Sequence, residues 1–165
     1  MSASIHRAAD TIRDMFEEHL WSYEYNEEKH RFTARHDLEI PELKETELHI
    51  YVRPSTIEPT RCLSIVAYGL THLKVAPDRI AQVGEYLTRA NFGLAIGNFE
   101  LDCENGTIRY KVSINCRSSL PGTSALEDMI AIPIAMFNRY GRGLLAVNAG
   151  TETAKEAAAK ADARS

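Results

Sequence analysis

Three segments of the chain carry apolar residues at the spacing of an amphipathic helix. The first covers residues 4–19, with Ser4 placed to cap its N-terminus. The second begins at Pro77, which a first helical turn tolerates, and ends at Asn91 or Gly93. The apolar stripes of these two helices consist of Ile5, Ala8, Ala9, Ile12, Met15, Phe16 and His19, and of Ile80, Val83, Leu87 and Ala90.

The third helical segment begins at Ser124, whose spacing to Glu127 is that of a capping box. Its apolar face contains Pro133, which removes one backbone hydrogen bond and predicts a kink. The Gly-Arg-Gly sequence at 141–143 is expected to end the helix, because glycine is a poor helix former. Residues 144–147 then predict a short apolar segment that closes the core.

Alternation of apolar and polar residues predicts four strands between the first two helices. They cover residues 21–25, 32–38, 46–53 and 62–70. The last of them is apolar on both faces, which is typical of an interior strand.

Asn105 and Gly106 predict a β-hairpin over residues 94–116, because both accept the positive φ angles of a type I′ turn. A two-residue loop places Asp102 opposite Arg109, and a slip of one residue would bring charges into the core. The face expected to be buried collects Phe99, Leu101, Cys103, Ile108, Tyr110, Val112 and Ile114. The charged pairs expected on the other face are Asp102 with Arg109 and Glu100 with Lys111.

The order of these elements, α-β-β-β-β-α-β-β-α, predicts an α+β fold with helices packed against an antiparallel sheet. Residues 1–150 are expected to form a single domain. Residues 151–165 are rich in Ala, Glu and Lys and hold no large apolar side chain, so they predict a solvated, marginal helix. Deleting this tail is then expected to leave the melting temperature and the oligomeric mass unchanged.

Composition and charge indicate which classes of binding partner are expected. The 165 residues are 44% hydrophobic and 25% charged, which is typical of a soluble globular protein. The net charge of −4 provides no positive field for nucleic acid. No apolar run approaches the roughly 18 residues of a membrane span, so no membrane partner is expected. The first ten residues lack the apolar core of a signal peptide, which predicts a cytoplasmic location.

The three cysteines, Cys62, Cys103 and Cys116, show no CxxC spacing. The predicted hairpin separates Cys103 from Cys116 by about 26 Å along the strands, too far for a disulfide. We therefore expect three buried, reduced thiols without a neighbouring base.

The histidines form none of the usual metal-binding spacings. A cluster of His30, His36 and His49 across neighbouring strands could hold a metal, but histidines on a solvated strand face are commoner. Neither a GxSxG elbow nor a dinucleotide fingerprint is present. Gly97 is expected to allow a close backbone approach to the sheet. The sequence thus predicts no catalytic residue, no cofactor and no metal site.

Two groups of side chains are candidates for binding. Arg117, Arg139 and Arg142 could form a basic patch near the end of the third helix, although arginines there also favour the helix dipole. His49, Tyr51 and Arg53 project from one face of their strand. If the helices cover the other face, this aromatic and basic stripe is a partner surface, and otherwise it is a solvated sheet face.

The segment from Leu87 through Asn91 to Gly97, Phe99 and Asp102 resembles the YbjN family of bacteria, whose members are described as sensory transduction regulators. That family has an LNxxN helix end, then a strand containing glycine and phenylalanine, then an acidic–glycine turn into a second strand. Leu87 and Asn91 match it, whereas Thr88 replaces the first asparagine. The resemblance covers residues 4–147 and implies a fold like that of type III secretion chaperones.

The resemblance implies a non-enzymatic activity and supplies no catalytic residue to carry over. We therefore expect a cytoplasmic protein-interaction module, chaperone-like or regulatory, with a protein partner of unknown identity. The chaperone-like fold also implies a homodimer. The alternative is a small-molecule-binding protein or an enzyme with a cleft near His49, Tyr51 and Arg53.

Overall fold

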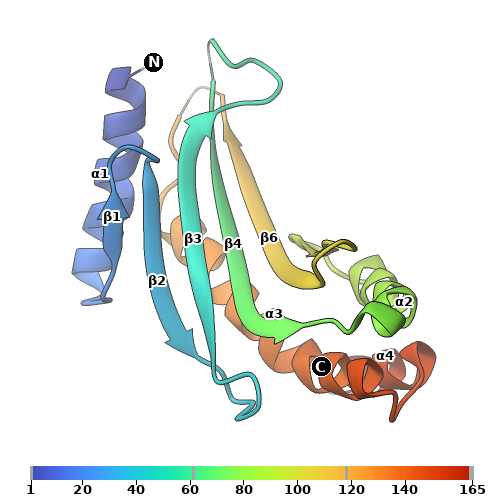
Figure 1. Ribbon diagram of the computed structural model, residues 1–165. Helices are drawn as coiled ribbons and strands as arrows, with labels where there is room; N and C mark the ends of the chain where they lie inside the picture. The colour runs from blue at the N-terminus through green and yellow to red at the C-terminus, as the bar shows by residue number, and fades with distance from the viewer. Residues whose placement is uncertain (1, 61, 118, 164–165) are drawn as a thin grey trace.

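Six antiparallel strands form one sheet in the order β1-β2-β3-β4-β6-β5 (Figure 1). The computed structural model describes residues 2–60, 62–117 and 119–163. Its strands are β1 (Glu24–Asn26), β2 (Arg31–Asp37), β3 (Glu45–Pro54), β4 (Leu63–Lys74), β5 (Asn98–Leu101) and β6 (Thr107–Cys116). Its helices are α1 (Ser2–Glu18), the 3-10 turn η1 (Pro77–Arg79), α2 (Ile80–Phe92), α3 (Thr123–Ala149) and α4 (Ala154–Asp162). The predicted α+β class and the predicted order of elements are confirmed.

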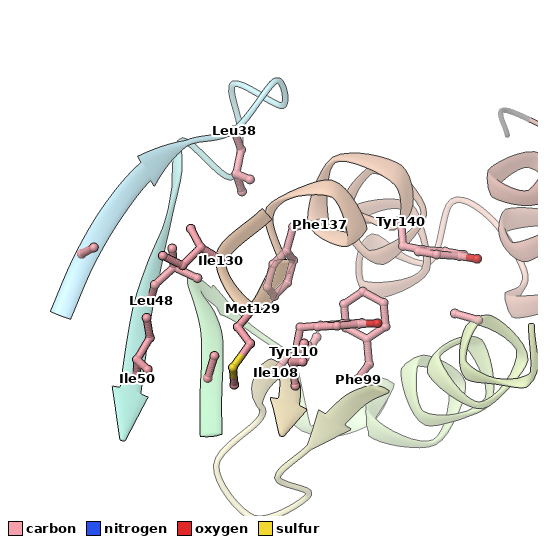
Figure 2. Close-up of a cluster of buried hydrophobic side chains, with 14 of the residues drawn as sticks. Leu38, Leu48, Ile50, Phe99, Ile108, Tyr110, Met129, Ile130, Phe137 and Tyr140 are labelled. Carbon is pink, nitrogen blue, oxygen red and sulfur yellow. The ribbon is translucent and has the colours of Figure 1, made fainter. Parts of the chain in front are cut away.

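Helices α1 and α3 pack on one face of the sheet, and α3 passes behind β3 and β4 in Figure 1. The alternation of each strand turns its apolar side chains toward these helices. Figure 2 shows side chains of β3, β5 and β6, among them Leu48, Phe99 and Tyr110, meeting Met129 and Phe137 of α3. The opposite face of the sheet therefore carries the polar side chains.

The first helix begins two residues earlier than predicted, and its apolar stripe from Ile5 to Phe16 is buried as expected. His19 is not at the edge of the core. It is exposed just beyond the helix, where its Nε2 lies 2.6 Å from Glu127 Oε1 and its ring stacks on Trp21. The following strand covers only Glu24–Asn26, so Trp21 and Tyr23 precede it.

The predicted register of the β5–β6 hairpin is wrong by two residues, since Glu100 rather than Asp102 lies opposite Arg109. Asp102 instead holds the loop: its carbonyl accepts from the Gly106 amide (2.8 Å) and its carboxylate accepts from the Glu104 amide (2.9 Å). Gly106 is the only residue of this loop with positive φ (69°), so the type I′ turn does not form. Asp side chains commonly cap turns in this way, and here the cap favours a longer loop.

A shift of two residues preserves the alternation, so the predicted buried face is largely correct. Phe99, Ile108, Tyr110 and Val112 are buried, whereas Cys103 falls in the loop and is exposed. The prediction of buried thiols is thus correct for Cys62 and Cys116 and wrong for Cys103. Burial raises the pKa of the Cys116 thiol.

Gly97, which precedes β5, makes the close approach that was predicted for it. Its φ is +74°, and a Cβ atom there would lie 2.6 Å from the backbone oxygen of Lys111. A larger residue at this position would therefore push the chain away from β6.

The third helix does not end at 141–143. It continues to Ala149 and ends at Gly150, which is left-handed (φ 73°), so residues 144–147 are its last turns. A Cβ atom on Gly141 would lie 2.7 Å from Ile40 Cδ1, and one on Gly143 would lie 2.7 Å from Tyr86 Cζ. These glycines permit close packing rather than stopping the helix. The N-cap is Gly122, without the side-chain bond predicted for Ser124.

The tail after residue 150 is not a solvated segment. Thr153 and Glu156 form a capping box that begins α4, and this helix contacts both α2 and α3. Its buried residues are Ala154, Ala157, Ala158 and Ala161. Asp162 accepts hydrogen bonds from the Arg139 guanidinium and the Tyr140 hydroxyl, both at 3.2 Å. We therefore revise the prediction that the tail can be removed without effect.

Candidate functional site: the open face of the sheet

The face of the sheet opposite α1 and α3, which we call the open face, is defined by strand register. Tyr51 lies opposite Val66, and His49 lies opposite Tyr68. The open face comprises Glu24, Asn26, Arg31, Thr33, Arg35, Asp37, Glu45, Glu47, His49, Tyr51, Arg53, Ser64, Val66, Tyr68, Leu70, Asn98, Glu100, Arg109, Lys111, Ser113 and Asn115. Val66 is buried although it is not part of the hydrophobic core, so side chains of the open face cover it.

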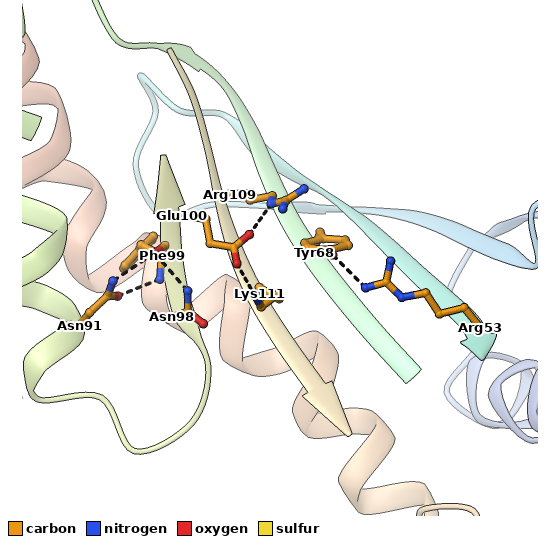
Figure 3. Close-up of polar contacts among 8 residues, drawn as sticks. All are labelled: Arg53, Tyr68, Asn91, Asn98, Phe99, Glu100, Arg109 and Lys111. Carbon is orange, nitrogen blue, oxygen red and sulfur yellow. Dashed lines mark hydrogen bonds and ion pairs between the residues drawn. The ribbon is translucent and has the colours of Figure 1, made fainter. Parts of the chain in front are cut away.

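Two tyrosines and two arginines form the centre of this face. The rings of Tyr51 and Tyr68 meet edge to face at 6.0 Å. The guanidinium of Arg109 lies over the Tyr68 ring, 4.2 Å from its centroid, and Arg53 donates to the Tyr68 hydroxyl at 3.2 Å (Figure 3). These contacts hold both aromatic side chains in fixed positions at the surface.

Ion pairs occupy the neighbouring part of the open face. Glu100 accepts hydrogen bonds from Arg109 Nε at 2.6 Å and from Lys111 Nζ, as Figure 3 shows. Glu47 binds Arg35 at 2.7 Å and His49 at 2.6 Å. Burial alone would raise the pKa of each glutamate, but the hydrogen bonds and charges of these partners outweigh it and lower the pKa.

The structure brings the three predicted residues, His49, Tyr51 and Arg53, to the same face, with His49 and Tyr51 in edge-to-face contact at 6.4 Å. Their role in binding stays a prediction. Sequence reasoning missed Tyr68 and Arg109, because only the register between strands shows that they adjoin Tyr51. The phenol of Tyr68, in a strand that is mostly apolar on both faces, was a local signal.

A groove of about 270 Å³ opens beside Arg53. Its polar lining includes Arg53, Ser64, Tyr68, Lys111, Ser113 and Asn115. Among the described residues no acidic side chain lines it, and neither His49 nor Tyr51 does. Of the three residues expected near a cleft, only Arg53 therefore lines this groove.

The predicted histidine cluster does not assemble. His36 pairs with Thr46 and His49 with Thr33, so the two side chains point to opposite faces of the sheet. His30 lies 3.3 Å from the hydroxyl of Tyr25. Within residues 2–60, 62–117 and 119–163, no group of three or more histidine, cysteine or acidic side chains is arranged to hold a metal.

Of the three arginines, Arg139 fits neither interpretation. Arg139 bonds to the carbonyl of Ala161 (3.3 Å) as well as to Asp162, so it fastens α4 and does not belong to a free patch. It also lies well before the last turn of α3, because that helix continues to Ala149. The dipole argument therefore does not apply to it.

Asn91, which carried part of the family resemblance, has a structural role. Its side-chain oxygen accepts from the Phe99 amide at 2.8 Å, and its side-chain nitrogen donates to the Phe99 carbonyl at 3.0 Å (Figure 3). The amide thereby joins the end of α2 to the start of the hairpin.

A comparison with protein-family models and with curated proteins found no match for this chain. In the described part of the chain, no helix combines the length and apolarity needed to cross a bilayer.

Proposed function

We propose that this chain is a non-enzymatic protein-interaction module, chaperone-like or regulatory, which binds a protein partner through its open face. The observation that carries the proposal is the cluster of Tyr51, Tyr68, Arg53 and Arg109 on a sheet face opposite the packed helices. Tyrosine and arginine are enriched at protein interfaces and among the residues that dominate binding energy. Side chains already fixed by mutual contacts lose little conformational entropy when a partner binds.

The sequence supports the remaining parts of the proposal. The resemblance to the YbjN family and to type III secretion chaperones favours a binding role over catalysis, and it adds a homodimer as a proposed assembly. We also propose a cytoplasmic location, and the net charge of −4 disfavours a nucleic-acid partner. The alternative, a small-molecule-binding protein or an enzyme with a cleft near His49, Tyr51 and Arg53, is less favoured because only Arg53 lines the groove.

The proposal is tested by affinity capture with a substituted open face. The tagged chain and a Tyr51→Ser/Tyr68→Ser variant are incubated with native lysate, and bound proteins are quantified. We expect at least one protein to be retained by the unsubstituted chain and lost by the variant. The matched control is Phe92→Ala, which removes an aromatic side chain that is 97% exposed at the end of α2. Melting temperatures of all three proteins exclude loss of folding.

Two outcomes would contradict the proposal. If every captured protein is retained by the Tyr51→Ser/Tyr68→Ser variant, the open face is not the binding surface. If Phe92→Ala alone abolishes capture, the partner binds at the α2 end instead.

A further inference from the structure

The charges of the open face are separated along the strands. The rows of paired residues nearest the 55–62 loop, which we call the cationic half, contain Arg53, Arg31 and Lys111. Their one acidic residue is Glu24, on the edge strand β1. The rows at the other end contain Glu47, Glu100, Asp37 and Glu45 with Arg35 and Arg109.

The two halves differ also in how their charges are satisfied. Arg35 and Arg109 are both paired with glutamates, at 2.7 and 2.6 Å. Arg53 instead contacts the neutral hydroxyl of Tyr68. The Nε atom of Arg31 is buried and has no hydrogen-bond partner within the described part of the chain. Lys111 is paired with Glu100 of the other half. Arg53 is therefore the exposed cation of the cationic half whose charge no described carboxylate offsets, and it is available to a ligand.

The groove beside Arg53 lies in this half and has a mixed surface. Ser64, Ser113 and Asn115 provide neutral hydrogen-bonding groups, while the exposed Ile57 and the half-buried Ile114 provide apolar contact. At about 270 Å³ it is smaller than the roughly 300–1,000 Å³ that enclose a drug-sized ligand. Its size suits one or two side chains of a larger partner.

We propose that the cationic half of the open face binds an extended, acidic segment of a protein partner, with a carboxylate of that segment at Arg53. The inference rests on the proposed function and specifies the chemistry of the partner. The positive, acid-free groove attracts a carboxylate, and the glutamates at the other end repel one, so the charge pattern also sets where the acidic segment lies. The apolar groups in the groove favour alternating acidic and aliphatic residues, the pattern of an extended chain.

Nucleic acid is the other polyanion that an aromatic and basic sheet face could bind. Base stacking requires a free ring face, whereas Arg109 already covers one face of the Tyr68 ring and Tyr51 packs against the same ring at 6.0 Å. The net charge of −4 also opposes binding of a long polyanion. The acidic protein segment is therefore the occupant that the observations favour.

The test uses NMR titration of the isotope-labelled full chain with three capped eight-residue peptides in which valine alternates with Glu, Gln or Lys. We expect the Glu peptide to shift the amide signals of Ser64, Tyr68 and Ser113. The Gln peptide should bind about fivefold more weakly, and the Lys peptide should not bind. Arg53→Glu should weaken binding of the Glu peptide at least about fivefold, and Arg53→Lys should leave this binding intact. The matched control is Lys155→Glu, which makes the same change of charge at an exposed position of α4.

Four results would each overturn the inference. The Glu peptide could fail to bind, bind no better than the Gln peptide, or shift only signals of the helices. An eight-nucleotide oligo-dT could bind the same residues more tightly. These results are separable from failure of the proposed function. A partner whose capture is lost with Tyr51→Ser/Tyr68→Ser but kept with Arg53→Glu would leave the proposed function standing and refute the acidic segment.

Discussion

The hydroxyl of Tyr86 donates a hydrogen bond of 2.7 Å to the backbone carbonyl of Tyr140, joining α2 to the middle of α3. The tyrosine is fully buried, and its ring lies against Gly143 one turn further along α3. Any residue other than glycine at position 143 would place its Cβ atom in overlap with the Tyr86 ring. The close packing of the two helices therefore depends on this glycine.

We expect Gly143→Ala to lower the free energy of unfolding by about 1–3 kcal/mol, because overpacking outweighs the better helix propensity of alanine. The measurement is urea denaturation followed by circular dichroism. Gly84→Ala is the matched control, since position 84 lies inside α2 and its nearest neighbour would be Leu101 Cδ2 at 3.9 Å. That substitution should raise the stability by up to about 1 kcal/mol. If both substitutions raise the stability, the Tyr86 side chain moves aside without cost and the packing does not depend on Gly143.

The alanine face of α4 predicts that the C-terminal helix contributes to stability. Ala157 is 2% exposed on this helix, which contacts both α2 and α3, whereas Ala159 on the same helix is exposed. Ala157→Gln should therefore lower the melting temperature, by about 2–4 °C for each kcal/mol lost, and Ala159→Gln should leave it unchanged. Deleting residues 151–165 should lower it further, because Arg139 and Tyr140 also lose their contacts with Asp162. Identical melting curves for the full and truncated chains would restore the view of a solvated tail.

The two hydrogen bonds between Asn91 and Phe99 predict that substitution of Asn91 lowers the stability of the fold. Asn91→Ala leaves the backbone amide and carbonyl of Phe99 without this partner, so the stability should fall by about 1–3 kcal/mol. Asn98→Ala removes a single, longer bond to the same carbonyl (3.2 Å) and should cost less than about 1 kcal/mol. Urea denaturation of both variants provides the comparison, and an equal loss would argue against the junction role of Asn91.

Local patterns predicted the elements well where a single face is buried. The alternation in β3 and the stripe of α1 identify their buried residues without knowledge of their partners. The spacing of Thr153 and Glu156 is that of a capping box, which is a local signal for the start of α4. The buried alanines of this helix give only a weak hydrophobic signal, because their side chains are small.

The remaining errors come from contacts between residues far apart in the chain. Gly143 resembles a helix stop until Tyr86 is known to pack against it. The turn at Asn105 and Gly106 resembles a two-residue loop until the Asp102 side chain is seen to hold it. The open face likewise needed the β3–β4 register, because Tyr51 and Tyr68 are 17 positions apart (68 minus 51) and meet only through that pairing.

The lowered pKa of Glu100 predicts how stability depends on pH. A carboxyl group whose pKa is lower in the folded state than its ordinary value of 4.5 stabilises the fold above that value, and the contribution disappears as the pH falls through the folded pKa. Glu100→Gln should thus be less stable than the unsubstituted chain at pH 7, by less than about 1 kcal/mol because Arg109 and Lys111 are partly solvated. At pH 3, below the ordinary value of 4.5, the difference should be smaller than at pH 7. Urea denaturation at both pH values measures the difference, with Glu104→Gln in the exposed hairpin loop as the control. A deficit of the same size at pH 7 and pH 3 would mean that lost packing, and not the ion pairs with Arg109 and Lys111, explains the effect of the substitution.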